Sequence, residues 1–253
     1  DAAGDQTVTK STGSGTTITY FNLTVGGSGT KTLAGNITVN GMLNIEQDAR
    51  LDAGASNYDI ALSSNWTNSS SNPLPFDARN GKVTFRSALG GQTIGGSSIT
   101  TFFNITNNNF SGPVTLLSPQ NLKGTLTMAA NSAWVTTGQA FTLKSDATRT
   151  ARIAEMPASA SFTGNITLER YIDGPAATGW RMIGSAVSNG GMPVSEITND
   201  IYSESIYRYF WDEPRYEWVR APVDALMSPA KGLFHQVQAD DVNKVISMTG
   251  TSY

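Results

Sequence analysis

Val39-Asn40-Gly41-Met42-Leu43-Asn44-Ile45 is the stretch that decides the fold, because it returns about 83 residues later as Leu122-Lys123-Gly124-Thr125-Leu126-Thr127-Met128. In both copies the glycine stands at the same place and apolar residues occupy every second position. Alternation with a period of two is typical of a β-strand, and its recurrence predicts strands that stack on one another. Stacked repeats usually form long surfaces rather than catalytic clefts.

Other residues extend this echo on both sides of the repeated block. Three further pairs keep the same offset, namely Leu51 with Trp134, Tyr58 with Phe141 and Ile60 with Leu143. Upstream, Tyr20-Phe21-Asn22-Leu23-Thr24 returns as Phe102-Phe103-Asn104-Ile105-Thr106, one residue out of phase. The sequence therefore predicts two copies of a repeat with a period of about 83 residues.

Composition sets the broad class of the protein. The chain has 253 residues, of which 39% are hydrophobic and only 15% are charged, and its net charge is −3. Ser, Thr, Asn and Gly are abundant, as expected of strands with polar outer faces and many tight turns. Lys and Arg are scattered singly, which argues against a nucleic-acid partner. No apolar run approaches the roughly 20 residues that span a bilayer.

The absence of cysteine excludes disulfides, thiol catalysis and cysteine-ligated zinc. Export remains compatible with this composition, because stacked ladders stabilise a large solenoid without disulfides. The first residue, Asp1, is not methionine, so we expect a mature product or a piece of a longer chain.

Short strands separated by Gly, Asn, Asp or Ser fill the first part of the chain. We expect strands at Phe21–Val25, Asn36–Ile45, Tyr58–Leu62, Val83–Phe85, Phe102–Thr106, Val114–Leu117, Leu122–Met128, Ala133–Thr136 and Phe141–Lys144, and a loop at Asn65–Pro75. A right-handed parallel β-solenoid and an antiparallel sandwich both fit this series. The repeated block, the corners rich in Asn and Gly, and the shortage of two-residue hairpin turns favour the solenoid.

The texture of the sequence changes near Arg149. We therefore predict an all-β protein with a β-solenoid over residues 1–150, a junction over 151–159 and an antiparallel β-sandwich-like domain over 160–253. In the last domain we expect strands at Asn165–Tyr171, Trp180–Ile183, Ser205–Trp211, Arg215–Arg220, Leu233–Gln238 and Val245–Met248. Ile206–Trp211 and Arg215–Arg220 would form a hairpin. The final strand stops abruptly, so we expect the natural protein to continue beyond Tyr253.

Several segments resemble a known group of proteins. Asn80–Phe85, Gly91–Ser97 and Phe102–Thr106 resemble the recurrent units of large Bacteroidota surface proteins, and Ser145–Ile153 is similar to the segment that closes their repeat array. Gly164–Ile172 followed by Gly179–Ile183 resembles the start of their next domain. The resemblance implies an exported, adhesin-like protein, often carried by type IX secretion with a C-terminal sorting domain. No sorting domain precedes Tyr253, so this route is implied only for the parent chain.

Catalytic patterns are weak. The only histidine, His235, alternates with Phe234 on an expected strand, and a surface or hydrogen-bonded structural role suits it best. Glu46, Asp48, Asp52 and Asp59 surround one turn, and we interpret them as a solvated rim. A calcium site through Asp48 and Asp52 lacks the spacing of a dedicated calcium loop. Asp240-Asp241 is a charged turn, and the glycine-rich segment at 90–96 lacks the lysine and helix of a phosphate loop.

Aromatic rows mark the second domain. Tyr207, Tyr209 and Trp211 share one face of their strand, and Tyr216 and Trp218 share one face of the next. If exposed, such rows would bind sugars by stacking, but burial in a sandwich core is the preferred interpretation. Asp212, Glu213, Arg208 and Arg215 would then decorate the hairpin tip and outer face.

Six Asn-x-Ser/Thr sequences occur, at Asn22, Asn36, Asn65, Asn68, Asn104 and Asn165. They are potential glycan acceptors, although the equivalent places of Asn22 and Asn104 in the repeat favour a structural role at a solenoid corner.

These observations predict a non-enzymatic extracellular or cell-surface protein with a structural or adhesive role, forming a stalk, sheath or filament. The expected partners are other domains of a longer parent chain or copies of itself joined end to end, with surface glycans as a further option. We expect no nucleic-acid partner, no membrane span, no cofactor, no metal and no catalytic residue, and the sequence leaves the ligand-binding residues unassigned. Two alternatives stay open: a carbohydrate-binding module that uses the C-terminal aromatics, and a polysaccharide-degrading β-helix enzyme.

Overall fold

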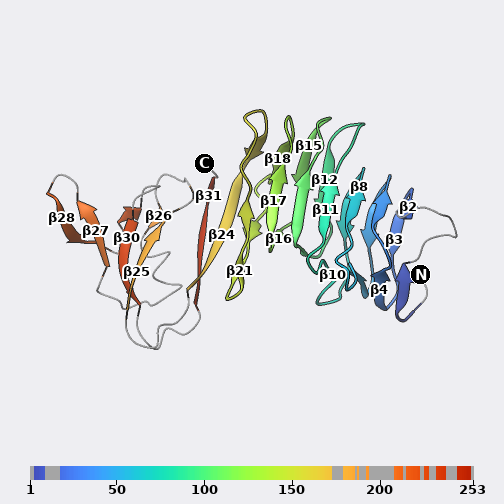
Figure 1. Cartoon of the computed structure of the whole chain (residues 1–253), viewed down its shortest axis with the longest axis horizontal. Coiled ribbons are helices and arrows are strands. Elements are labelled where there is room, and N and C mark those ends of the chain that lie inside the picture. Colours follow the sequence, from blue (N-terminus) through green and yellow to red (C-terminus); the bar gives the residue numbers. More distant parts are fainter. Residues whose placement is uncertain are drawn as a thin grey trace. The chain divides into compact units, whose positions relative to one another are not determined.

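A computed structural model describes residues 3–8, 18–172, 179–185, 187, 192–193, 208–212, 215–222, 225–227, 232–237 and 244–251. The described residues contain only strands, turns and irregular segments (Figure 1). They contain no helix that is long and apolar enough to cross a membrane. The chain divides into two compact units: unit 1 comprises residues 1–142 and 151–164, and unit 2 comprises residues 143–150 and 165–253.

Unit 1 is a parallel β-solenoid, as the sequence predicts, and the alternative antiparallel sandwich is wrong for this region. The chain winds through repeated coils, and each strand pairs in parallel with the strand one coil later (Figure 1). One sheet contains β2 (Ile18–Tyr20), β5 (Ile37–Val39), β8 (Ile60–Leu62), β11 (Lys82–Phe85), β14 (Asn104–Asn107), β17 (Thr125–Met128) and β22 (Arg152–Ile153). We call it the first sheet.

The second sheet follows the first one around the coil. It contains β3 (Leu23–Val25), β6 (Leu43–Ile45), β9 (Trp66–Asn68), β12 (Gln92–Gly95), β15 (Pro113–Leu116), β18 (Ala133–Val135) and β23 (Ser161–Thr163). The third strand of each early coil lies in a sheet of β1 (Gln6–Val8), β4 (Gly29–Leu33), β7 (Ala49–Asp52) and β10 (Phe76–Asp77). Later coils place it at β13 (Thr100–Phe102), β16 (Gln120–Leu122) and β19 (Phe141–Leu143).

The structural repeat is a single coil. Residues paired in register along the first sheet, from Ile18 to Ile153, follow one another at intervals of 19 to 27 residues. The 83-residue echo joins different sheets, since Val39 ends β5 in the first sheet and Leu122 ends β16 in another. The variable coil length hides the shorter period from the sequence.

The echo marks a repeated corner instead. Asn22 lies beneath Gly41, and its Oδ1 accepts a hydrogen bond of 2.8 Å from the backbone N–H of Met42. Asn104 accepts an equivalent bond of 3.0 Å from Thr125, beneath Gly124. A Cβ on Gly41 would lie 2.0 Å from the Asn22 oxygen, so a side chain there would displace the asparagine. The same corner device thus occurs on two different edges of the coil.

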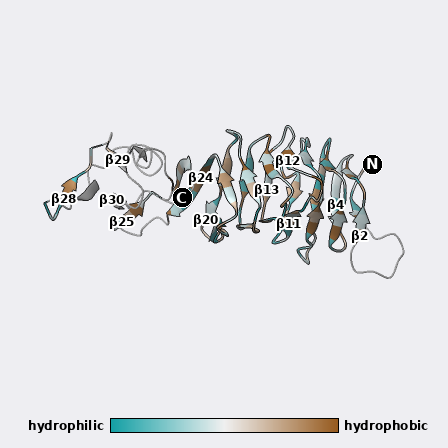
Figure 2. Cartoon of the chain, turned by 90° about the horizontal axis from the view of Figure 1, so that it is seen from above, coloured by the Kyte–Doolittle hydropathy of each residue, from teal (hydrophilic) through white to brown (hydrophobic). Residues whose placement is uncertain are grey.

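The core runs through the middle of the coils. Inward positions alternate with outward ones, and the inward residues are almost fully buried. Trp66 contacts Phe102 with ring centroids 5.1 Å apart, and Phe85 bridges Phe102 and Trp134 at 6.3 and 6.5 Å. In Figure 2 hydrophobic and hydrophilic segments are accordingly interleaved along the coils.

Two segments of unit 1 differ from the sequence-based expectations. The predicted loop at Asn65–Pro75 contains strand β9, and Trp66 within it is completely buried. The predicted junction at 151–159 belongs to the last coil, because β22 pairs with β17 and β23 pairs with β18. Polar residues around Trp66 concealed the first of these strands, and Pro157 with its small neighbours suggested a linker in the second.

Unit 2 is antiparallel, as expected from its sequence. A hairpin joins β20 (Ser145–Asp146) to β21 (Arg149–Thr150), and β24 (Asn165–Ile172) pairs with β31 (Lys244–Thr251). A further sheet has the order β25 (Gly179–Gly184), β30 (Gly232–Val237), β27 (Arg208–Asp212) and β28 (Glu217–Arg220). Two short strands, β26 (Met192–Pro193) and β29 (Leu226–Met227), also pair. The pairing of β27 with β28 confirms the predicted hairpin.

Candidate functional site

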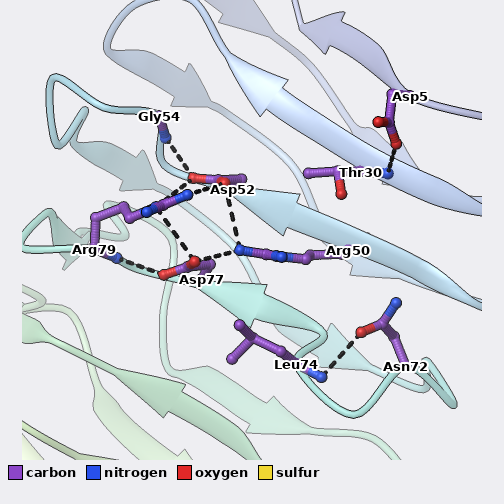
Figure 3. Close-up of polar contacts among 9 residues, drawn as sticks. All are labelled: Asp5, Thr30, Arg50, Asp52, Gly54, Asn72, Leu74, Asp77 and Arg79. Carbon is purple, nitrogen blue, oxygen red and sulfur yellow. Dashed lines mark hydrogen bonds and ion pairs between the residues drawn. The ribbon is translucent and has the colours of Figure 1, made fainter.

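The described part of the solenoid contains a closed cluster of two arginines and two aspartates. Arg50 and Asp52 lie on β7, Asp77 ends β10, and Arg79 follows two residues later (Figure 3). The Arg79 guanidinium donates to both oxygens of Asp52, with distances of 3.0 and 2.8 Å. It also lies 3.2 Å from Asp77, which Arg50 contacts from the other side. The four charges therefore cancel within the cluster.

Asp52 holds the centre of this charge cluster. Its residue surface is only 5% exposed, and its Oδ1 also accepts a hydrogen bond of 2.8 Å from the N–H of Gly54. The hydrogen bonds from Arg79 hold the pKa of Asp52 below its ordinary value, although burial alone would raise it. The same contact raises the pKa of Arg79. Asp52 is thus ionised and fully engaged, which fits a brace between coils better than a general acid.

The structure separates the acidic residues that the sequence places around one turn. Asp48 accepts a hydrogen bond from the Ser71 hydroxyl, while Asp59 forms an exposed ion pair of 3.2 Å with Lys82. Glu46 joins neither contact among the described residues. No group of three or more His, Cys, Asp or Glu side chains in the described ranges could hold a metal ion. The interpretation as a solvated rim is therefore wrong for Asp52, which is buried, whereas Asp48 and Asp59 are accessible to solvent.

Most of the asparagines in the Asn-x-Ser/Thr sequences have a structural role in the coil. Like Asn22 and Asn104, Asn36 and Asn65 accept backbone N–H bonds from the next coil, each of 2.9 Å. Asn68 is completely buried. Asn165, at the start of β24, is exposed. The structural role expected for Asn22 and Asn104 thus extends to further members of the set.

An aromatic platform lies on the β25-β30-β27-β28 sheet of unit 2. We use this name for Trp180, Phe234 and Trp218. Trp180 stacks on Phe234 with centroids 4.8 Å apart and planes at 8°, and Trp218 contacts the same ring at 5.5 Å. Trp180 is 38% exposed and Trp218 is 46% exposed, whereas Ile183 and Leu233, on the opposite face, are buried. The platform therefore faces outward.

This finding corrects the expected core role of Trp218 and Tyr216. Tyr216 is 80% exposed in the turn before β28, so it does not share a strand face with Trp218. Tyr207 lies outside the described residues, as do Glu213, Asp240 and Asp241. The backbone places Trp211 opposite Trp218, and His235 opposite Arg181 and Arg208. Arg215 is exposed and lies 3.8 Å from Glu217.

A cavity of about 270 Å³ opens at the first described coil. Its lining includes Gln6, Val8, Tyr20, Leu23 and Lys31. Lys31 is only 4% exposed, and its ammonium donates to the carbonyl oxygens of Gly4 and Ser28, at 2.7 and 2.8 Å. Burial raises the pKa of the Tyr20 hydroxyl. Because the Lys31 ammonium already donates to two backbone carbonyl oxygens, we assign this lysine a structural role.

Sequence reasoning missed the partners in both sites. The only linear trace of the charge cluster is the mirror order of Arg50-Leu51-Asp52 and Asp77-Ala78-Arg79. Trp180 and Phe234 lie far apart in the sequence, and only the pairing of β25 with β30 brings them together. Comparison with known proteins adds no further assignment, because no family model, curated protein or solved structure matches the chain.

Proposed function

We propose that this chain is a non-enzymatic structural or adhesion protein of the cell surface or extracellular space, in which the solenoid forms an extended surface. The main observation that supports this proposal is the regular coil of unit 1, in which the backbone pairing and the outward side chains recur from one coil to the next. Such an arrangement distributes binding chemistry along a surface. The resemblance to exported Bacteroidota surface proteins supports the same location, with type IX secretion as the route of the parent chain.

Exposed apolar side chains support contact with a partner. Phe21 is 76% exposed, Leu89 100% and Phe110 67%, and all three lie where the chain passes from the first sheet to the second. A single exposed apolar residue is common on protein surfaces, but recurrence at the same corner of several coils offers repeated points of contact. The proposed partners are other domains of the parent chain or further copies of the protein.

End-to-end assembly is the specific form that we propose. Among the described strands, β2 pairs only with β5 and β3 only with β6, which leaves one edge of each for a further strand. Electron microscopy and light scattering of the concentrated protein test this directly. Filaments or concentration-dependent growth in mass support the proposal, and isolated monomers at high concentration contradict it. Thr24→Pro, which alters the free edge of β3, should weaken assembly, because proline cannot donate a strand hydrogen bond.

A carbohydrate-binding module is the second candidate function, and the aromatic platform favours it. Flat aromatic rings exposed on a rigid sheet can stack on the apolar faces of sugar rings. Binding on a glycan array that is lost in both Trp180→Ala and Trp218→Ala would support this function, while unchanged binding in both variants would count against it.

The polysaccharide-degrading alternative has weaker support. It requires carboxylates that act together, and here Asp52 is engaged by Arg79 while Asp48 contacts Ser71. Turnover of a uronic-acid polymer that is lost in Asp48→Asn or Asp52→Asn would establish it.

A further inference from the structure

A straight row of threonines crosses the outer face of the first sheet. Backbone register places six residues side by side on successive strands, in the order Thr19, Thr38, Ala61, Thr84, Thr106 and Thr127. We call this set the threonine row. Each member is exposed or half-buried, whereas its neighbours in the strand, such as Val83 and Phe85, are buried. The row therefore faces solvent along its whole length.

The hydroxyl groups of the row are available for a ligand. None of the five threonines makes a side-chain hydrogen bond within the described part of the chain. A hydroxyl offers one donor and two acceptor sites, so five of the six coils present the same small set of polar sites, and only the coil of Ala61 presents none. A threonine side chain also has a restricted χ1 angle, which lowers the entropy lost on binding.

The spacing of the row is fixed by the backbone. Neighbouring strands lie about 4.8 Å apart, so the six positions extend over roughly 24 Å. One sugar residue of an extended β-linked polysaccharide advances by a similar distance. A chain laid across the strands would therefore bring a new sugar to each coil, with hydroxyl groups facing hydroxyl groups.

The polar and charged residues beside the threonine row favour a polysaccharide ligand over an ice surface. Two residues before the last five positions of the row lie Asn36, Asp59, Lys82, Asn104 and Thr125, which are polar or charged. Asn36 and Asn104 are oriented by hydrogen bonds to the next coil, and Asp59 is paired with Lys82 at 3.2 Å. These groups suit the dense hydroxyls of a glycan, whereas charged groups disturb an ordered water lattice.

We propose that the threonine row binds a neutral, extended β-linked polysaccharide along the solenoid axis. The row itself carries no charge, and its charged neighbours Asp59 and Lys82 neutralise each other, so a neutral polymer matches this face. The inference rests on the proposed adhesive function and names its ligand class.

The test uses the full chain, with microcrystalline cellulose and chitin as probes in a pull-down titration. Thr38→Val, Thr84→Val and Thr106→Val in one variant remove three hydroxyls and keep the branched shape of the side chains. We expect binding to weaken at least tenfold, because three hydrogen bonds are lost together. The matched control carries Thr67→Val, Thr93→Val and Thr115→Val on the second sheet, and it should bind as the original protein does. Circular dichroism melting curves confirm that both variants fold.

Each result has a defined meaning. Equal binding by the two valine variants, or no binding of either probe by the original protein, overturns the threonine row as the site. Binding that persists in both valine variants but is lost in Trp218→Ala places the ligand on unit 2, and the adhesive function then stands without this inference. Ice shaping by the original protein that is lost in the row variant and kept in the second-sheet variant would identify ice as the ligand of the row and would also overturn the inference.

Discussion

The two units place their aromatic side chains in opposite ways. In the solenoid, Trp66, Phe102 and Trp134 point into the coil and are completely buried. In unit 2, Trp180 and Trp218 lie on the outer face of a sheet and contact Phe234 between them. Similar residue types thus stabilise one unit and equip the other for contact. The difference shows that alternation along a strand identifies two faces but does not say which one is buried.

The strongest way to break this comparison is to remove a ring from the coil. Phe102→Ala should lower the free energy of unfolding by about 3–5 kcal/mol, because a large buried side chain leaves a cavity among Trp66, Phe76 and Phe85. Urea unfolding followed by circular dichroism measures the loss. Leu89→Ala, at a fully exposed position, is the control and should change stability by less than about 0.5 kcal/mol. Equal losses would show that the coil interior does not govern stability.

Two glycines, one in each unit, offer a second contrast. Gly41→Ala should destabilise the solenoid by about 1–3 kcal/mol, because its Cβ would lie 2.0 Å from the Asn22 oxygen. Gly184→Ala in unit 2 meets no atom within 4 Å and should be nearly neutral. Thermal melting of the two variants provides the comparison. An equal change in melting temperature in the two variants would mean that Asn22 moves aside without a cost in stability.

The charge cluster should matter more than an exposed ion pair. Asp52→Asn removes one of the two carboxylates that Arg50 and Arg79 share, and we expect a loss of about 1–2 kcal/mol, reduced by the partial exposure of Arg79. Asp59→Asn is the matched control, because it keeps an oxygen for the N–H of Lys82 and loses only an exposed charge. That variant should stay within about 0.5 kcal/mol of the original protein in urea unfolding.

The same cluster predicts a dependence of stability on pH. The pKa of Asp52 in the folded protein lies below its ordinary value of 3.8. The unfolded chain therefore binds the proton first as the pH falls, so the contribution of Asp52 is complete well above 3.8 and disappears below the folded pKa. Melting temperatures of the original protein and Asp52→Asn should differ at neutral pH and converge in strong acid. A difference that stays constant across this range would rule out the ion pair as its cause.

Sequence reasoning identifies the class of fold well and its period poorly. Alternating residues predict the strands, but Asn36–Ile45 forms two strands, β5 and β6, with a corner at Gly41 between them. Apolar alternation continues across this corner, since both strands turn the same kind of side chain inward. Coil lengths vary, so the clearest echo is a corner device on two different edges. Whether a segment forms a strand can be predicted from neighbouring residues, whereas the register between coils depends on residues far apart in the sequence.

The sites depend on contacts that the linear sequence does not contain. Asp52 meets Arg79 only because β7 and β10 are adjacent in the coil. The threonine row likewise requires the register of six strands, although each threonine is an ordinary outward residue. Residue types suggested sugar binding by aromatics, but exposure of Trp218 needed the sheet order of unit 2. The residue types that could act in a site were thus predictable from the sequence, but which of them lie together in the fold was not.

The smallest expected effect on stability gives the sharpest test of the comparison. Trp218→Ala removes a half-exposed ring and one contact with Phe234, so we expect a loss of about 1 kcal/mol or less. If the aromatic platform is a sugar site, the same variant should lose most binding on a glycan array. Leu89→Ala, at a fully exposed position in the solenoid, controls for the loss of exposed apolar surface away from the platform and should retain binding. A large loss of stability with unchanged binding would assign Trp218 to the core of unit 2 and make the two units alike.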